Sequence, residues 1–551
     1  MEHIVGIDFG TTNTVATIIT PAGPKVILDH EGNRLTPSVV AKAHGNLQVG
    51  HDAKQNALAF GNDNGIKEIK REIGSNKTVL FAGERLKPLE IAAMILKKVK
   101  RNVEINLGDH VKKAVITVPA EFSDQQRHEI MEAGKIAGFH VEKIINEPTA
   151  AIMSYVYRQK IRQGTVLCYD FGGGTFDVSV ADIHDGNIVV RCVGGDRRLG
   201  GSDIDKTMLD KIKHELESVK GCRLSKTGIY ELSLAVEKTK IHLSNNETAS
   251  INSRFTTITG EKVQYFKKVD RETFESWIEH HINKTIQIVV DLLDEYNINP
   301  QQHIDTVLLV GGSSQIPLVN KKLYLLFGKA STTGKVYTDE SVSIGAAIEA
   351  NNKINKGKTI GPGITQDVAP FTIGLKVGID GNSDVFDPVI RKNFPYNQEY
   401  SEIYDTAIDY QKTMLLQIYQ GEDPTATENE HICDFEIEGI PEREAGKESV
   451  KVSFIYDDNG IIHINATILS TGRRLNKEVT YKRKLSYSQT SQSKEKVKKH
   501  FNTTDQQFED ALTLNKSLKT YAMSEESKKL EAALKKDDLN EIKKMEAALF
   551  D

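Results

Sequence analysis

The sequence predicts a mixed α/β domain with two related halves, followed by an all-β domain and a short helical tail. Two glycine-rich stretches predict the related halves, because Asp8-Phe9-Gly10 and Asp170-Phe171-Gly172 each stand between two short apolar runs. Short runs in which apolar and polar residues alternate predict the all-β domain. The expected boundaries are 1–358 for the α/β domain, 359–368 for a linker, 369–485 for the β domain and 486–551 for the tail.

The composition is that of a multidomain globular protein, with 551 residues of which 39% are hydrophobic and 27% charged. A net charge of −5 argues against a general nucleic-acid binder. Cys168, Cys192, Cys222 and Cys433 are far apart, which fits a reducing compartment and neither a zinc site nor a disulfide framework. No signal peptide begins the chain, and no apolar run approaches the roughly 18 residues of a membrane helix. We therefore expect a cytoplasmic protein that binds neither nucleic acid nor membranes.

Periodicity and end signals define the elements of the first half. Ile66, Ile69 and Ile73 fall on one helical face, and apolar residues at helical spacing indicate a second helix from Leu89 to Val103. The other expected elements are a hairpin in 1–20, short strands in 25–60, a strand at 114–119 that a proline ends, a helix at 123–137 that a capping box begins, and a strand, loop and helix around 144–151.

The second half begins with a central glycine turn. Thr165–Tyr169 leads into it and Phe176–Val180 leads out, which indicates a strand–turn–strand unit and not a strand–turn–helix unit. The following elements are tight turns in 193–203, helices in 204–245, strands in 249–269, a helix at 271–295, a strand at 306–310 whose glycine turn opens a helix, and a last helix from 339.

After a linker composition at 355–368, short alternating runs indicate β-hairpins. The run Val450–Tyr456 is joined to Ile461–Ala466 by an Asp-Asp-Asn-Gly turn. The tail is charged and has leucines at helical spacing, among them Leu530 and Leu534. Because the tail is too short for a core of its own, we expect it to pack on the β domain.

The glycine turns indicate a phosphate site. Glycine lets backbone N–H groups crowd around an oxygen-rich ligand, and the carboxylates at the ends of each turn could hold cations. The two hairpins are expected to face one phosphate chain. Other nucleotide sites do not fit, because the stretch 328–336 lacks the Walker spacing, no G-x-G-x-x-G follows a strand, and the kinase catalytic loop is absent.

Four motifs in this order resemble the actin-like ATPase superfold and, within it, the seventy-kilodalton heat-shock chaperones of the DnaK type. They are Gly6–Asn13, Ala114–Ala120, Ile144–Ala151 and Asp170–Asp177. The resemblance covers roughly residues 1–485. It implies a two-lobed ATPase domain, a peptide-binding β-sandwich and a helical lid. It also implies an ATP-hydrolysing chaperone that binds and releases apolar segments of unfolded proteins, with a J-domain co-chaperone and a nucleotide exchange factor as partners.

The resemblance also implies roles for single residues. Lys70 would stabilise the γ-phosphate and the attacking water, with Glu147, Asp170 and Thr175 completing the catalytic set. Asp8 and Asp170 would hold Mg²⁺ through waters, and Asp177 would contribute to a K⁺ site. Residues expected to bind ATP or ADP are Gly10, Thr11, Thr12, Asn13, Gly172, Gly173, Gly174, Gly200, Gly201, Glu237, Lys240, Ser244, Gly311, Gly312, Ser313 and Asp339.

Coupling between the two activities would involve Pro119 and Arg127, and peptide binding would involve Ala407 and Met414. Three of the implied residues also have simpler interpretations. A lysine on a helix is commonly solvated, a glutamate at a strand–helix junction is often a cap, and a methionine in a strand is often a core side chain. These interpretations apply to Lys70, Glu147 and Met414.

Two departures from the family pattern are expected to have consequences. Gln315 replaces an arginine that stacks on adenine, so nucleotide affinity is expected to be lower or exchange faster. The linker lacks a leucine-rich run, which leaves Ile364 and Val368 to supply apolar burial at about 1.5–3 kcal/mol per side chain. Weak docking of the linker and weak coupling are the expected results, and the short tail is expected to close poorly over a client.

Two alternative functions belong to other classes. One is an ATP-binding regulator that hydrolyses little and acts as an exchange factor, against which the set Lys70, Glu147, Asp170 and Thr175 argues. The other is a sugar-kinase-like enzyme on the same superfold, against which the β domain argues.

Overall fold

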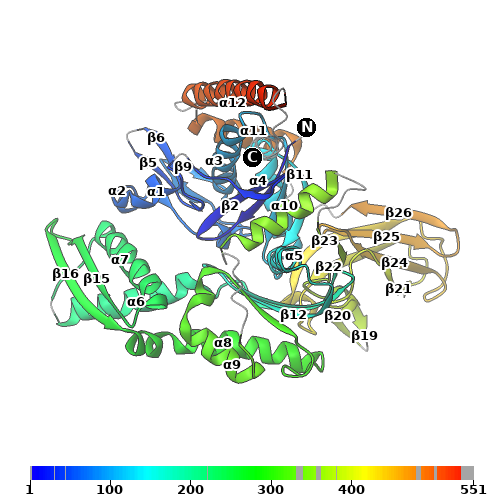
Figure 1. Ribbon diagram of the computed structural model, residues 1–551. Coiled ribbons are helices and arrows are strands. Elements are labelled where there is room, and N and C mark those ends of the chain that lie inside the picture. The colour runs from blue at the N-terminus through cyan, green and yellow to red at the C-terminus, as the bar shows by residue number, and fades with distance from the viewer. Residues whose placement is uncertain are drawn as a thin grey trace.

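The computed structural model describes residues 3–29, 31–43, 45–219, 221–330, 339–354, 361–379, 381–478, 485–501 and 505–534. These residues form a mixed α/β part, a part made of two four-stranded sheets, and two C-terminal helices (Figure 1). This is the fold class that the sequence predicts. None of the helices in these ranges has an apolar stretch long enough to cross a bilayer. The four cysteines are free thiols.

The two halves of the α/β part have central sheets with the same topology. In each sheet three consecutive strands form an antiparallel meander, and a later strand pairs in parallel with the first strand of the meander. We call the half around the first sheet the first lobe and the half around the second sheet the second lobe. The first sheet contains β1 (Ile4–Phe9), β2 (Asn13–Thr20), β3 (Gly23–Val26), β4 (Thr36–Pro37), β10 (Lys113–Val118) and β11 (His140–Asn146). The second sheet contains β12 (Gln163–Phe171), β13 (Phe176–His184), β14 (Asn187–Asp196), β17 (Thr306–Val310) and β18 (Ile364–Gln366).

Two helices, α5 (Glu147–Gln159) and α10 (Ser341–Ile354), pack between the two central sheets (Figure 1). They approach so closely that a Cβ on Gly345 would lie 1.8 Å from the carbonyl oxygen of Ala150. The other elements of the α/β part are β5 (Val40–Ala43), β6 (Asn46–Val49), α1 (His51–Gln55), α2 (Ala57–Gly61), β7 (Gly65–Ile66), η1 (Ile69–Glu72), β8 (Val79–Phe81), β9 (Glu84–Leu86), α3 (Pro88–Leu107), α4 (Asp124–Ala137), α6 (Gly201–His214), η2 (Glu215–Val219), α7 (Lys226–Asn245), β15 (Thr248–Thr256), β16 (Lys262–Asp270), α8 (Arg271–Glu295), η3 (Gly312–Gln315) and α9 (Pro317–Phe327).

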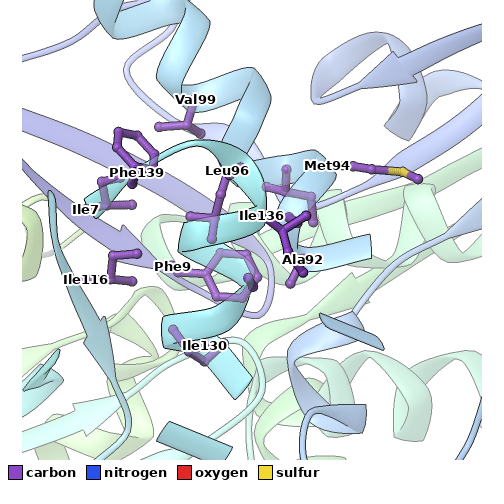
Figure 2. Close-up of a cluster of buried hydrophobic side chains, with 14 of the residues drawn as sticks. Ile7, Phe9, Ala92, Met94, Leu96, Val99, Ile116, Ile130, Ile136 and Phe139 are labelled. Atoms are coloured by element: carbon purple, nitrogen blue, oxygen red, sulfur yellow. The ribbon is translucent and has the colours of Figure 1, made fainter. Parts of the chain in front are cut away.

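The core of the first lobe fixes the first hairpin. Figure 2 shows strand residues Ile7, Phe9 and Ile116 among side chains of α3 and α4, including Leu96 and Ile130. All five are fully buried. Because Phe9 is locked in this core, its neighbours on either side are held at the edge of the sheet.

The β domain consists of two four-stranded sheets with a shared apolar core. The turn predicted after Tyr456 joins β24 and β25, which pair in antiparallel register. The elements are β19 (Ile373–Ile379), β20 (Asn382–Ile390), β21 (Tyr400–Asp405), β22 (Thr413–Gln420), η4 (Ala426–Glu428), β23 (Glu430–Glu438), β24 (Ser449–Tyr456), β25 (Ile462–Ile468) and β26 (Arg473–Glu478).

The linker docks on the second lobe although it lacks a leucine-rich run, and the weakness of that docking stays a prediction. Its backbone forms β18, which adds to the second sheet in parallel with β14. Val368 is buried behind it, with 1% of its surface exposed. Backbone pairing of this kind does not depend on side-chain identity, so the sheet accepts the linker without a leucine-rich run.

The tail packs on the first lobe, and the prediction that it packs on the β domain is wrong. Helices α11 (Tyr487–Phe501) and α12 (Asp505–Leu534) lie along α3 and α4 (Figure 1). Val497 and Phe501 join the core of the first lobe. The Arg101 guanidinium stacks on Phe501 at 4.5 Å and on Phe508 at 5.0 Å, and it forms an ion pair with Asp505. The last predicted part of the helical tail, 535–551, lies outside the described residues.

His500 is expected to make this contact sensitive to pH. It is buried on α11, with its ring centroid 5.6 Å from that of Phe81. Burial lowers the pKa of His500, and Lys42 and Lys499 lower it further, while Glu84 and Glu90 act in the opposite direction. An undocked His500 would keep an ordinary pKa of about 6.5. The docking free energy is therefore fully present above that pH and is lost as the pH falls towards the lowered pKa.

We expect α11 to become less protected from amide hydrogen exchange between pH 7.5 and pH 5.5, after correction for intrinsic exchange. One proton limits the effect to about tenfold in the docking equilibrium per pH unit. His500→Gln removes the titrating group and should remove the pH dependence. Equal pH dependence in both proteins would contradict this assignment.

Candidate functional site

The two glycine-rich hairpins face each other across the interface between the lobes. A Cβ on Gly173 would lie 1.9 Å from the hydroxyl oxygen of Thr12, and a Cβ on Gly174 would lie 2.3 Å from that of Thr11. Only glycine therefore fits at these two positions. The sequence predicts this juxtaposition from the repeated Asp-Phe-Gly pattern, and the related sheet topologies produce it.

A cavity of about 90 Å³ lies where the hairpins meet, and we call it the phosphate cavity. It has glycine backbone, threonine hydroxyls and charged side chains in its wall, which suits a phosphate chain. Its lining includes most of the residues expected at the catalytic, metal and phosphate positions: Asp8, Gly10, Thr11, Thr12, Asn13, Lys70, Glu147, Asp170, Gly172, Gly173, Gly174, Thr175, Gly311, Gly312 and Asp339.

Lys70 and Glu147 form a buried ion pair in this cavity. Lys70 has 2% of its surface exposed, so it is not the solvated helical lysine of the simpler interpretation. The predicted helix around 66–74 is a four-residue 3₁₀ helix, η1, because Glu68 has a left-handed φ of 58° that stops the helix on its N-terminal side. Ile69 and Ile73 are buried as expected, and they hold Lys70 in place.

Glu147 begins α5, directly after the last residue of β11. The N-cap position of α5 is occupied by Asn146, so Glu147 is the first helical residue and not the cap of the simpler interpretation. The carboxylate instead pairs with the Lys70 ammonium.

Three further carboxylates lie close to this pair. Burial and the charge of Glu147 raise the pKa of Asp8 to about 7 and that of Asp177 to about 8, and burial raises the pKa of Asp170 well above its ordinary value. Thr117 donates a hydrogen bond to Asp8 at 3.1 Å. The Oδ2 atom of Asp177 is buried and has no hydrogen-bond partner among the described residues.

These buried carboxylate oxygens around one lysine are suitable ligands for cations. Hard cations such as Mg²⁺ and K⁺ favour oxygen ligands, and Mg²⁺ commonly keeps several waters. In the described part of the chain, no three His, Cys, Asp or Glu side chains converge closely enough to bind a metal ion directly. Asp8, Asp170 and Asp177 could therefore hold cations together with water and phosphate oxygens.

A second cavity of about 340 Å³ adjoins the phosphate cavity at Thr11, Thr12 and Gly173, and we call it the nucleoside cavity. Glu237 and Lys240 of α7 line it together with Gly201. The Lys240 ammonium donates to the carbonyl oxygen of Gly201 at 3.1 Å.

The N-terminus of α6 and the start of η3 support the central glycine turn. The backbone N–H of Gly201 donates to the carbonyl oxygen of Gly172 at 3.0 Å, and the Ser313 hydroxyl donates to the same oxygen at 2.9 Å. A Cβ on Gly200 would lie 2.6 Å from the backbone of Gly173. These residues shape the turn from outside the phosphate cavity.

Two predicted residues lie away from the cavities. Ser244 is one helical turn beyond Lys240, with its hydroxyl 3.5 Å from the carbonyl oxygen of that lysine. Gln315 is exposed at the end of η3. Neither lines the phosphate cavity or the nucleoside cavity. The expected effect of Gln315 on nucleotide affinity stays a prediction.

Contacts across the mouth of the nucleoside cavity were not predicted from the sequence. Phe60 of α2 stacks on Tyr230 of α7, with ring centroids 3.8 Å apart and an interplanar angle of 7°. The Lys54 ammonium forms an ion pair of 2.8 Å with Glu237. These four residues come from distant segments and have no shared motif, so no sequence signal could have found them.

Arg71 also joins the lobes without a sequence signal. Its guanidinium donates to the carbonyl oxygen of Gly174 at 2.9 Å and forms an ion pair with Asp203.

The residues predicted to take part in coupling lie where the β domain meets the first lobe. Arg127 is buried and donates to the carbonyl oxygen of Ala120 at 3.0 Å and to the side chain of Asn146 at 2.7 Å. The Asn146 amide in turn donates to Asp367 of the linker at 3.1 Å. Pro119 is buried two residues before Glu121, which forms an ion pair of 2.9 Å with Lys392 of the β domain.

In the β domain, Ala407 is exposed in the loop between β21 and β22, and its N–H donates to the Gln411 side chain at 2.8 Å. Met414 belongs to the apolar core, with 8% of its surface exposed. The simpler interpretation of Met414 as a core side chain therefore agrees with the structure, and its contact with a peptide stays a prediction.

Comparisons with known proteins cover nearly the whole chain. Residues 4–82 and 76–551 match the family described as Hsp70 protein. The chain is 37% identical to the chaperone protein DnaK of Thermosipho africanus (strain TCF52B), over 98% of this chain and 94% of that protein. It is 36% identical to the chaperone protein DnaK of Thermotoga neapolitana, over 100% of this chain and 93% of that protein. A third similar protein is the chaperone protein DnaK of Thermotoga petrophila, 37% identical over 91% of this chain and 84% of that protein.

Proposed function

The chain belongs to the Hsp70 family, and on this premise we propose that it is an ATP-dependent chaperone that binds and releases apolar segments of unfolded proteins. Hydrolysis of ATP would accompany peptide binding and release. The observation that carries the proposal is the buried Lys70–Glu147 ion pair, which lies in the phosphate cavity beside Thr175.

Hydrolysis in this site would depend on positioning and charge. Phosphoryl transfer to water needs little covalent help from the protein, and neutralising donors around the phosphate account for most of the catalysis. The Lys70 ammonium would neutralise charge on the γ-phosphate and hold the attacking water. The Glu147 carboxylate would orient that water or accept its proton. The backbone of Gly172–Gly174, with Thr11 and Thr12, would hold the phosphate oxygens.

Cations would complete the site. Mg²⁺ bound with ATP would neutralise phosphate charge, held by Asp8 and Asp170 through waters, and Asp177 would contribute to a K⁺ site. The high pKa values of these carboxylates support this, because a bound cation would keep all three ionised at neutral pH.

The β domain presents an apolar rim that suits an extended peptide. Four large apolar side chains on β21, β22 and the loop between them are more than half exposed. They are Ile403, Ile408, Tyr410 and Leu415. They lie on both sides of the exposed Ala407 along the chain, and a peptide could bind there through backbone hydrogen bonds and apolar pockets. The family premise adds a J-domain co-chaperone, a nucleotide exchange factor and a cytoplasmic location to the proposal.

Steady-state ATP turnover with and without a model apolar peptide tests the proposed function. Turnover should rise when the peptide is added. If ADP and peptide both bind but no ATP is hydrolysed, the protein is a binding relative and not a chaperone ATPase. If ATP is hydrolysed and peptide binds without changing the rate, the two domains are not coupled.

The contacts at the mouth of the nucleoside cavity should slow nucleotide release. We expect Phe60→Ala to speed the release of fluorescent ADP about 2- to 13-fold, because an aromatic stack contributes about 0.5–1.5 kcal/mol beyond its buried area. Leu58→Ala is the matched control, because Leu58 lies on the same helix and is 68% exposed. Stopped-flow displacement measures both variants, and equal release from Phe60→Ala and wild type would show that the stack does not close the cavity.

A further inference from the structure

A third cavity, of about 520 Å³, adjoins the phosphate cavity at Lys70 and Thr175. Those two residues do not line the nucleoside cavity, which adjoins the phosphate cavity at Thr12 and Gly173 instead. Thr11 lines all three cavities, and Arg71 lines both the nucleoside cavity and the third cavity. The phosphate cavity thus has two different neighbours. The third cavity adjoins the phosphate cavity at the residues proposed to hold the γ-phosphate, and the nucleoside cavity adjoins it at the residues that face the rest of the nucleotide.

We propose that inorganic phosphate leaves the site through the third cavity, past Lys70 and Thr175, while ADP remains bound. The inference rests on the proposed ATP hydrolysis. After the bond to the γ-phosphate breaks, ADP fills the nucleoside cavity and the hairpin turns. The side at Thr12 and Gly173 is then closed by the other product, whereas the third cavity remains available to a phosphate ion.

The charges that line the third cavity favour an anion. Its cations include Arg197 and Arg198, and both arginines are exposed. Two of its acids are neutralised by lysines outside the lining. Glu121 pairs with Lys392 at 2.9 Å, and Asp196 pairs with Lys284 at 2.6 Å. Exposed cations around a cleft attract anions and raise their rates of passage.

Arg197 also connects the walls of the cavity. Its guanidinium donates to the Gln126 side chain at 3.1 Å, and Gln126 donates to the carbonyl oxygen of Ile73 in the first lobe at 3.1 Å. The same guanidinium lies over the ring of Phe371 at 5.4 Å, and Glu430 of β23 completes the lining. The docked β domain therefore forms part of the exit, so undocking would change the path of the phosphate.

The test measures the entry of a phosphate-sized anion through the third cavity instead of its exit, because entry can be measured separately from hydrolysis. Protein is loaded with fluorescent ADP, and beryllium trifluoride is then added, which traps the ADP when it binds beside it. The rate of trapping is the rate at which the fraction of ADP that is rapidly released declines. Charge reversal by Arg197→Glu with Arg198→Glu should lower the second-order trapping rate constant at least about 10-fold, a change of the size that electrostatic steering produces. ADP affinity without the fluoride should stay within about twofold.

The matched variant places the same charge change on the second lobe outside the three cavities, by Lys238→Glu with Lys268→Glu. Both lysines are exposed and line none of the three cavities. Its trapping rate constant should stay within about twofold of wild type when ADP is saturating. Unchanged trapping in the arginine variant, or equal slowing in the lysine variant, would overturn the route. Failure of wild type to bind ADP or to hydrolyse ATP in a chemical-quench assay would instead overturn the proposed function itself, and the route with it.

Discussion

Lys70→Met is expected to lower the rate of single-turnover ATP hydrolysis at least about 100-fold, the usual effect of removing one preorganised donor from a charge-stabilising site. Lys70 is the one cation among the described residues that line the phosphate cavity. Methionine keeps most of the volume of the side chain but cannot neutralise the γ-phosphate or hold water. Thr175→Ala should also lower the rate, because Thr175 lines the same cavity next to the proposed position of the attacking water.

This expectation needs a control for stability, because Lys70→Met leaves Glu147 buried without its partner. Breaking a buried ion pair on one side typically costs about 3–5 kcal/mol. Lys70→Met combined with Glu147→Gln removes both charges and should recover much of the stability without recovering hydrolysis. Lys77→Ala is the matched surface control, since Lys77 is 67% exposed and pairs with Glu72 at 3.1 Å.

Chemical-quench kinetics with ATP in single turnover measure the rate, and thermal unfolding with and without ADP measures stability and binding. Hydrolysis at the wild-type rate in the folded double variant would contradict the assigned role. A fall that tracks only the loss of folded protein would contradict it as well.

The features that could be predicted from the sequence are those encoded locally. Each hairpin is specified by an apolar run, a glycine turn and a second apolar run, so Asp8 and Asp170 could be placed at the ends of strands. The helices from Leu89 and from Ser123 could be predicted because their apolar spacing and end signals agree with their tertiary environment. The α-helix predicted for the Ile66–Gly74 segment is wrong, because the same spacing of isoleucines that fits an α-helix also fits a 3₁₀ turn held by buried neighbours.

The features that could not be predicted depend on contacts between distant segments. Neither Phe60 nor Tyr230 has a neighbour in sequence that signals a stack between lobes. The tail carries an apolar face at Val497 and Phe501, but sequence periodicity states only that this face is buried and not which surface buries it. Arg101 of α3, about 400 residues away in the chain, provides part of that surface.

The linker shows the same distinction in energetic terms. Counting leucines measures the apolar area that a linker can bury, and this linker contains no leucine. Its docking instead uses backbone hydrogen bonds to the open edge of a sheet. Because these bonds do not depend on side-chain identity, they leave no pattern in the sequence. Coupling between the domains should then depend less on the apolar side chains of the linker than on the polar group that orients it, and this group is Asp367.

Asp367→Ala is accordingly expected to reduce peptide stimulation of ATP turnover to less than about twofold. The Asp367 carboxylate accepts hydrogen bonds from Asn146 at 3.1 Å to each oxygen and from Thr149 at 3.4 Å, and Asn146 is itself held by Arg127. A hydrogen bond to a charged group contributes about 1.5–3 kcal/mol, so losing this acceptor should lower the equilibrium constant for docking by roughly 10- to 150-fold.

Three measurements separate loss of coupling from loss of either activity. Peptide affinity and basal single-turnover hydrolysis should persist in Asp367→Ala, while the amides of Ile364–Gln366 should exchange faster because β18 no longer pairs with β14. Glu399→Ala is the matched control, since its carboxylate is half exposed and pairs with Lys451 at only 3.6 Å, an interaction typically worth less than about 1 kcal/mol. Full peptide stimulation despite rapid exchange of these amides would show that docking of the linker does not couple the two sites. Coupling would then have to pass through the direct contacts between the β domain and the lobes, such as the ion pair of Lys392 with Glu121.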